Sequence, residues 1–157
     1  MSQLLERQAV QCPYHLAQRY LADSVGTQAA SGSESKLHLT ASFPGIALAK
    51  EVLVTFGNAL DPMHFDQPWH IHWKPQAGPY PEFDGELTVR ADETYRSAFL
   101  ELRGAYRPPG GALGTAFDWA AGSRIARTTA RELLQRIGAE MEARYERDER
   151  NKAETSA

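Results

Sequence analysis

Alternating apolar and polar residues mark five segments in the middle of the chain as β-strands. Between residues 36 and 43 every second residue is apolar, and a period of two is typical of a half-buried strand. The same alternation recurs in the segments 50–57, 68–74, 85–91 and 97–106. No helical crossover separates these segments, and parallel pairing would require one. The pattern therefore predicts an antiparallel meander.

Helical spacing predicts a short helix before these strands. Residues 14–26 carry apolar side chains on one side, and Gly26 is expected to end the helix. Residues 27–35, rich in Ser, Gly and Ala, have no apolar pattern and are interpreted as a linker. Residues 4–11 are too short and too mixed in character to assign.

A long helix is expected to follow the last strand. It should begin near Thr115, where Thr115 and Asp118 form a variant of the capping box, and its apolar stripe runs toward Tyr145. Some 30 residues would span about 45 Å, which is longer than a small sheet is wide. We therefore expect a single domain over 1–145 and a polar tail at 146–157 that projects, frays or is disordered.

Composition places the chain among ordinary globular proteins. It has 157 residues, of which 42% are hydrophobic and 24% charged, and its net charge of -3 gives no electrostatic reason to expect nucleic acid. The only cysteine, Cys12, excludes an intramolecular disulfide. No apolar run is long enough for a signal peptide or a membrane span. We expect a cytoplasmic protein.

The order of elements, together with the segment YRPPGGALGTAFDWAAGSRIARTTARELL, resembles the START-like or helix-grip superfamily. This group includes the SRPBCC-type polyketide cyclases, hormone-binding proteins and lipid-transfer domains. The resemblance covers residues 4–145 and rests on pattern. It implies an α+β fold in which an antiparallel sheet of six or seven strands curves around one long C-terminal helix and encloses an apolar cavity. Counting the ambiguous residues 4–11 as a strand, the sequence offers six strands and one N-terminal helix, where the family usually has seven and two.

The aromatic residues of the segment 68–74 indicate which face of the sheet is buried. Trp69, Ile71 and Trp73 share one face, and each buried aromatic side chain removes ~150–250 Å² from water. This face should therefore point toward the long helix. Core packing and ligand lining both remain open for these side chains.

The candidate ligand-binding residues come from inward strand positions, the Pro-rich loop and the helix stripe. They are Phe56, Trp69, Ile71, Trp73, Tyr80, Leu87, Val89, Leu100, Leu102, Tyr106, Phe117, Ala121 and Ile125. In a meander the loops 44–47, 75–83 and 108–114 fall at one end, which we predict to be the mouth of the cavity.

His70 and His72 have the spacing of a metal-binding pair on a strand, and His64 and Asp66 share their parity. Because Trp69 and Trp73 are expected to face the long helix, the two histidines should lie on the solvated outer face, so no metal is expected. The glycines at 110, 111 and 114 match no phosphate-binding motif, and no cofactor is predicted.

Binding of a small or medium hydrophobic molecule is the function that the pattern favours. One alternative is a cyclase or dehydratase acting in the same cavity, which uses Tyr106 as a hydrogen-bond donor together with polar groups from the loops. The other is a protein-interaction module with a filled core, docking through Arg124, Arg127 and Arg131. A homodimer is compatible with each of these functions.

Overall fold

A computed structural model describes residues 2–31, 35–43, 46–56, 68–75, 82–107 and 119–156. In chain order the elements are β1 (Ser2–Val10), α1 (Tyr14–Ser31), β2 (Ser35–Phe43), β3 (Ile46–Phe56), β4 (Trp69–Pro75), β5 (Glu82–Ala91), β6 (Ala98–Arg107) and α2 (Trp119–Thr155).

The described strands all belong to one antiparallel sheet with the order β1-β6-β5-β4-β3-β2. The predicted α+β class, the antiparallel sheet and the long C-terminal helix are confirmed. Side chains are described for the strands β1, β4, β5 and β6, which are fewer than the six or seven strands expected. For β2 and β3 only the backbone is described. The meander of β2 to β6 is the one that the alternation predicts.

The N-terminal strand β1 closes the sheet on the side of β6. Its register pairs Ser2 with Tyr106 and Val10 with Ala98. The alternation of apolar and polar residues did not reveal this strand because its inward positions are not all apolar. Glu6 is one of them, and its carboxylate accepts a hydrogen bond from Arg131 Nε of α2 at 2.9 Å. Arg131, which allows an acidic side chain at this inward position, lies 125 residues away in the sequence.

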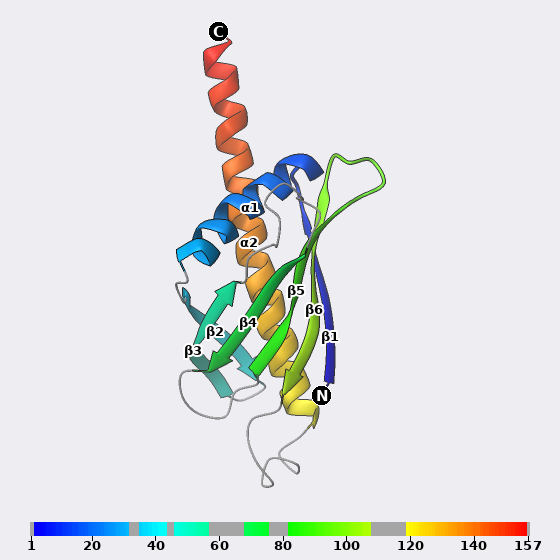
Figure 1. Cartoon of the computed structure of the whole chain (residues 1–157), viewed down its shortest axis with the longest axis vertical. Helices are drawn as coiled ribbons and strands as arrows, with labels where there is room; N and C mark the ends of the chain where they lie inside the picture. Colours follow the sequence, from blue (N-terminus) through cyan, green and yellow to red (C-terminus); the bar gives the residue numbers. More distant parts are fainter. Residues whose placement is uncertain are drawn as a thin grey trace.

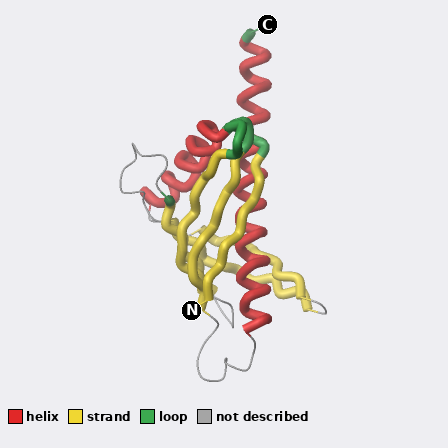
Figure 2. Tube along the Cα trace, turned by 90° about the vertical axis from the view of Figure 1, so that its right-hand side faces the viewer, coloured by secondary structure: helices red, strands yellow, loops and turns green. Residues whose placement is uncertain are grey.

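The sheet bends around α2. Both edge strands, β1 and β2, contact this one helix, so the sheet cannot be flat. Figure 1 shows the strands crossing the helix, and the side view in Figure 2 shows the helix lying along one face of the sheet. α1 packs against α2, β3 and β5 and covers the other end of that face.

The core lies between the inner face of the sheet and α2, as the strand parity predicts. The buried sheet residues include Ile71, Trp73, Phe83, Leu87, Leu100 and Leu102, and the buried helix residues include Ile125, Ala126, Ala130, Leu133, Leu134 and Met141. The helix residues recur every three or four positions and form one stripe. Two of the residues in that stripe are alanines, which let the helix approach the sheet closely.

Both helices run further than predicted. α1 continues through Gly26 to Ser31, and the expected linker therefore begins later. A glycine inside a helix costs only about 1 kcal/mol relative to alanine, which packing against three other elements can offset. The proposed capping box at Thr115 and Asp118 lies outside the described residues.

The expected tail is helical in the structure. α2 continues past Tyr145 to Thr155 and projects beyond the sheet (Figure 1). Its 37 residues span about 55 Å, whereas a ten-residue strand spans about 33 Å. Charged neighbours such as Glu149 and Lys152, whose carboxylate and ammonium groups lie 3.2 Å apart, support the exposed turns.

Two glycines face each other where β5 and β6 pair, at Gly85 and Gly104. The ring of Phe83 lies over both of them. A Cβ atom on Gly104 would lie 2.3 Å from the carbonyl oxygen of Asp84 and 2.7 Å from Phe83 Cζ, and one on Gly85 would lie 2.3 Å from the carbonyl oxygen of Arg103. The backbone atoms cannot move aside cheaply. This pair of glycines is therefore what lets Phe83 lie flat against the sheet.

We predict that Gly104→Ala lowers the free energy of unfolding by about 2–3 kcal/mol, because the new methyl group overpacks the sheet. Chemical denaturation monitored by circular dichroism measures the change. Gly138→Ala in α2 is the matched control, because its Cβ would approach no atom closer than Val10 Cγ2 at 3.3 Å. An equal loss of stability in both variants would contradict this explanation.

Candidate ligand-binding site

Aromatic side chains line the inner face of the sheet near the ends of β4, β5 and β6. Trp73 and Phe83 stack with ring centroids 4.1 Å apart and an angle of 18° between their planes. Tyr106 is the cross-strand partner of Phe83, and Trp69 is half-buried against the core. The register places Trp73 and Phe83 opposite one another, so the stack is set by strand pairing.

Among the buried polar side chains of the described residues, the hydroxyl of Tyr106 is the exception. Tyr106 is only 4% exposed, and no described residue offers its hydroxyl a hydrogen bond. The other buried hydroxyls have partners: Thr129 donates to the carbonyl oxygen of Ile125 at 2.8 Å, and Tyr20 donates to Asp148 Oδ2 at 2.6 Å. Buried polar groups in proteins nearly always have a partner, which makes Tyr106 a candidate for contact with a ligand.

Eight of the predicted lining residues are brought together in the buried core. They are Ile71, Trp73, Leu87, Val89, Leu100, Leu102, Tyr106 and Ile125. Phe56 and Ala121 lie in β3 and α2, where only the backbone is described, and the register pairs Phe56 with Ile71. Tyr80 and Phe117 lie outside the described residues. Whether these side chains enclose a cavity or fill a core stays a prediction.

The predicted mouth falls largely on residues that the structure does not describe. The strand ends that flank two of its loops are nonetheless brought together, since Glu82 at the start of β5 pairs with Arg107 at the end of β6. The register also places Val52 opposite Pro75 at the end of β4. Tyr106 therefore lies at the end of the sheet that we predict to be open.

Sequence reasoning missed Phe83, which it assigned to the Pro-rich loop. β5 begins at Glu82, so Phe83 is an inward strand residue. Its parity with Leu87 and Val89 was the available signal. Gly85 interrupts the apolar alternation, so Phe83 is recognised as a strand residue only when the pairing of Gly85 with Gly104 is known.

The outer face of the sheet carries the histidine pair, as predicted. His70 Nε2 lies 2.9 Å from Asp84 Oδ1, and His72 Nδ1 lies 3.3 Å from Asp84 Oδ2. Partial burial alone would raise the pKa of Asp84, but its contacts with the two imidazoles lower it overall. Of the cluster drawn from the sequence, the residues at 64 and 66 lie outside the described part of the chain. Within that part, no group of three or more ligating side chains is arranged to hold a metal ion.

Glu101 also faces outward, but its carboxylate is buried. The side chain is 3% exposed because Arg7, Arg90 and Arg103 cover it, with Nε of Arg7 at 2.8 Å and Nε of Arg90 at 3.1 Å from its oxygens. Burial alone would raise the pKa of Glu101. The hydrogen bonds and positive charges of Arg7 and Arg90 outweigh burial and lower the pKa below its ordinary value of 4.5.

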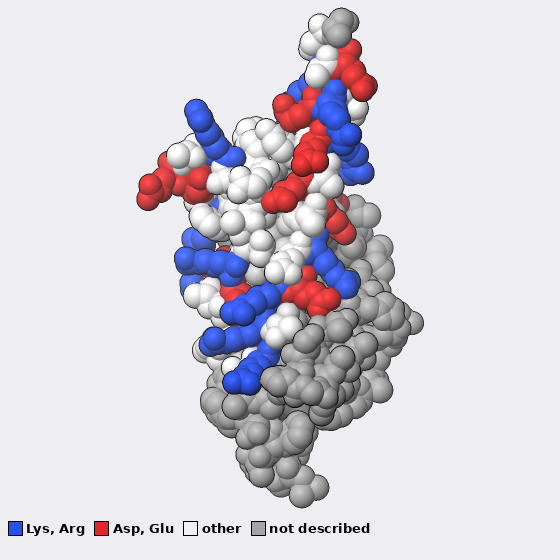
Figure 3. Space-filling view, turned by 180° about the vertical axis from the view of Figure 1, so that it is seen from behind, with Lys and Arg blue, Asp and Glu red and all other residues white. Residues whose placement is uncertain are grey.

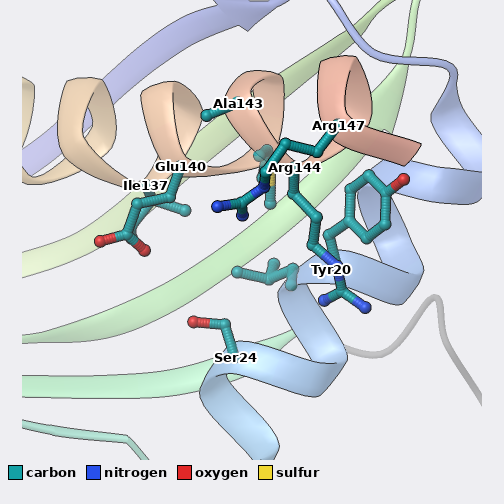
Figure 4. A pocket seen from close by; sticks show the side chains of 9 residues that line it. Tyr20, Ser24, Ile137, Glu140, Ala143, Arg144 and Arg147 are labelled. Atoms are coloured by element: carbon teal, nitrogen blue, oxygen red, sulfur yellow. The ribbon is translucent and has the colours of Figure 1, made fainter. Parts of the chain in front are cut away.

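A second hollow lies between α1 and α2, away from the predicted site. A pocket of about 350 Å³ there is lined by Tyr20, Leu21, Ser24, Ile137, Glu140, Met141, Ala143, Arg144 and Arg147 (Figure 4). The guanidinium of Arg144 lies 4.4 Å from the ring centroid of Tyr20 and donates to Asp23 Oδ2 at 2.8 Å. Burial and the hydrogen bond to Asp148 raise the pKa of Tyr20 to about 12, so its hydroxyl stays neutral.

Cys12 is an unsuitable nucleophile. It is fully buried, and burial together with the charge of Glu142 raises the pKa of its thiol to about 11. The thiolate, which is the reactive form, is therefore scarce at neutral pH.

The arginines that suggested a docking face are exposed on α2. Arg131 pairs with Glu6, while Arg124 and Arg127 point to the surface. Figure 3 shows Lys and Arg gathered on the lower part of the described surface, and acids mixed with bases along the projecting end of α2. None of the described helices is long and apolar enough to cross a membrane.

Comparisons with known proteins identify the fold. No protein-family model matches the sequence, and a search of curated proteins finds no relative. The crystal structure of Ara h 8.0201 superposes with a TM-score of 0.53 at 11% identity, covering 89% of this chain and 97% of that one. TTHA0849 from Thermus thermophilus gives a TM-score of 0.46 at 10% identity, covering 88% and 98%. The likeness to Ara h 8.0201 shows a shared helix-grip fold.

We predict that Glu101→Gln lowers the free energy of unfolding at pH 7 by roughly 1–2 kcal/mol, since it removes a buried charge that three arginines surround. Because the folded protein holds the pKa below 4.5, the contribution of the carboxylate is present above pH 4.5 and is lost as the pH falls through the folded-state pKa. The gap between wild type and variant should therefore close in acid.

Urea denaturation at a series of pH values measures this gap. Glu86→Gln, an exposed change on the same face, is the control and should shift stability by less than about 0.5 kcal/mol. A gap that stays constant as the pH is lowered would contradict the assignment to Glu101.

Proposed function

We propose that this protein binds a small or medium hydrophobic molecule between the inner face of the sheet and α2, and that the Tyr106 hydroxyl donates a hydrogen bond to it. The ligand would carry a carbonyl or another acceptor at the end nearest Tyr106. Its apolar body would lie against the aromatic residues of β4 and β5.

The unpartnered hydroxyl of Tyr106 is the observation that carries the proposal. Leaving a buried donor unsatisfied costs about 1–3 kcal/mol, and a ligand acceptor would recover much of that free energy. A phenylalanine would fill the same space without the cost, so a tyrosine at this position favours a role for the hydroxyl. The residue stands 4% exposed at the end of β6, where a ligand entering from the loops would meet it.

The neighbouring side chains fit a flat or elongated apolar ligand. Trp73 and Phe83 present stacked rings whose planes differ by 18°, and aromatic rings of this kind pack well against planar molecules. Trp69 is half-buried on the same face. Ligand pockets are usually mostly apolar with a few placed polar groups, and one tyrosine in an aromatic wall matches that composition.

The described residues favour binding over catalysis. A cyclase or dehydratase needs an acid and a base that face the substrate. On the inward positions of β1, β4, β5 and β6 the ionisable side chains are Glu6 and Tyr106, and Glu6 is already paired with Arg131. A lone tyrosine orients a ligand, but it does not supply both halves of an acid–base pair.

Native mass spectrometry of the purified protein, followed by denaturation and identification of released small molecules, tests the proposal. We expect wild-type protein to release an apolar compound with a hydrogen-bond acceptor. We expect Tyr106→Phe to retain about tenfold less of it, which corresponds to the loss of one buried hydrogen bond.

Tyr95→Phe is the matched control, because Tyr95 is 65% exposed in the β5–β6 turn and should not affect retention. Thermal unfolding of both variants checks that the fold is kept. Equal retention of ligand by Tyr106→Phe and wild type would remove the basis of the proposal.

A further inference from the structure

The pocket between α1 and α2 is separate from the inner face of the sheet. None of the lining residues predicted from the sequence contributes to it, and its walls come from one face of each helix. Ile137, Glu140, Met141 and Arg144 occupy positions i, i+3, i+4 and i+7 of α2 and so share one face of that helix. Its volume of about 350 Å³ falls in the range of small-molecule sites, roughly 300–1,000 Å³.

The pocket has an apolar floor. Leu21 and Met141 are 1% and 3% exposed, and Ile137 packs against the same core. A methionine adapts its shape to different apolar groups. The floor therefore suits a flexible hydrocarbon chain.

Two arginines stand over this floor. Arg144 is held in place by the ring of Tyr20 and by Asp23. Arg147 has no hydrogen-bond or ion-pair partner among the described residues, and in Figure 4 its side chain lies beside that of Arg144 above the pocket. A guanidinium in this position is free to bind an anion with two parallel hydrogen bonds.

An adjoining hollow of about 530 Å³ shares Tyr20 and Arg144 and adds further positive charge. Together the two hollows are lined by four basic side chains, Arg19, Arg144, Arg147 and Lys152, and by two acidic ones, Glu140 and Asp148. Asp148 accepts the hydroxyl proton of Tyr20. Glu140 lies toward Ile137 in Figure 4, away from the Tyr20 side of the pocket. The pocket is thus apolar below, and basic side chains outnumber acidic ones around the two hollows.

We propose that the α1–α2 pocket binds an amphipathic anion, a molecule with an apolar chain and a carboxylate or phosphate head. The chain lies on Leu21 and Met141, and the head binds Arg147 beside the fixed guanidinium of Arg144. The head can come from a free acid or from a phosphate ester, because both present oxygens to guanidinium groups in the same way. This site is independent of the one proposed at Tyr106.

Methyl NMR with three probes of equal chain length tests this proposal. Octanoate and octyl phosphate carry the two heads, and octanol carries no charge. The reporters are two isoleucines, Ile137 in the pocket and Ile71 on the inner face of the sheet. We expect at least one anion to shift the Ile137 methyl resonances and leave those of Ile71 unchanged, and octanol to bind at least tenfold more weakly.

Variants test the role of the charge. Arg147→Gln should weaken binding of the anion about fivefold or more, whereas Arg150→Gln, an exposed arginine on the same helix outside both hollows, should not change it. Ser24→Trp fills the pocket from α1 and should abolish the Ile137 shift. Circular dichroism confirms that each variant keeps its helices.

The outcome with the two anions identifies the head. Octanoate alone would indicate a carboxylate, and octyl phosphate alone a phosphate ester. No shift of Ile137 with either anion, equal binding of octanol, or unchanged binding by Arg147→Gln would overturn the proposal. A shift at Ile71 alone would also overturn it, while supporting ligand entry at the inner face of the sheet.

Discussion

The apolar stripe of α2 has to be covered by one sheet, and this requirement governs the rest of the molecule. A flat sheet would cover the helix with its centre only. Here both edge strands, β1 and β2, contact the helix, so the sheet is strongly bent. On the inner face of this sheet, the paired glycines Gly85 and Gly104 leave room for the ring of Phe83 to lie flat against the strands.

The buried polar side chains of the described residues differ in whether they have a hydrogen-bond partner. Glu101 is buried on the outer face, yet Arg7, Arg90 and Arg103 surround it. Tyr20 is buried between the helices, and Asp148 accepts its hydroxyl proton. Tyr106 has no such partner among the described residues. Since the other buried polar side chains of the described residues have partners, the unpaired hydroxyl supports the proposed hydrogen bond to a ligand.

Local periodicity predicted the meander, the inward face of Trp73 and the long helix, because each depends on residues close together in sequence. It failed where the deciding partner is distant. β1 was unreadable because Glu6 depends on Arg131, and Phe83 looked like a loop residue because the glycine that accommodates it is on the next strand. The α1–α2 pocket was also missed, since its walls come from helices more than 100 residues apart in the chain. Periodicity placed Tyr106 and Trp73 on the inner face of the sheet. It does not distinguish side chains that line a cavity from side chains that fill a core.

A high-resolution crystal structure of the protein as purified from its source would show whether a ligand lies between the sheet and α2. We predict density for a non-protein molecule there, with an acceptor atom within hydrogen-bond distance, about 2.7 Å, of the Tyr106 hydroxyl oxygen. A structure in which protein side chains fill that space and one of them accepts the Tyr106 hydroxyl proton would contradict it.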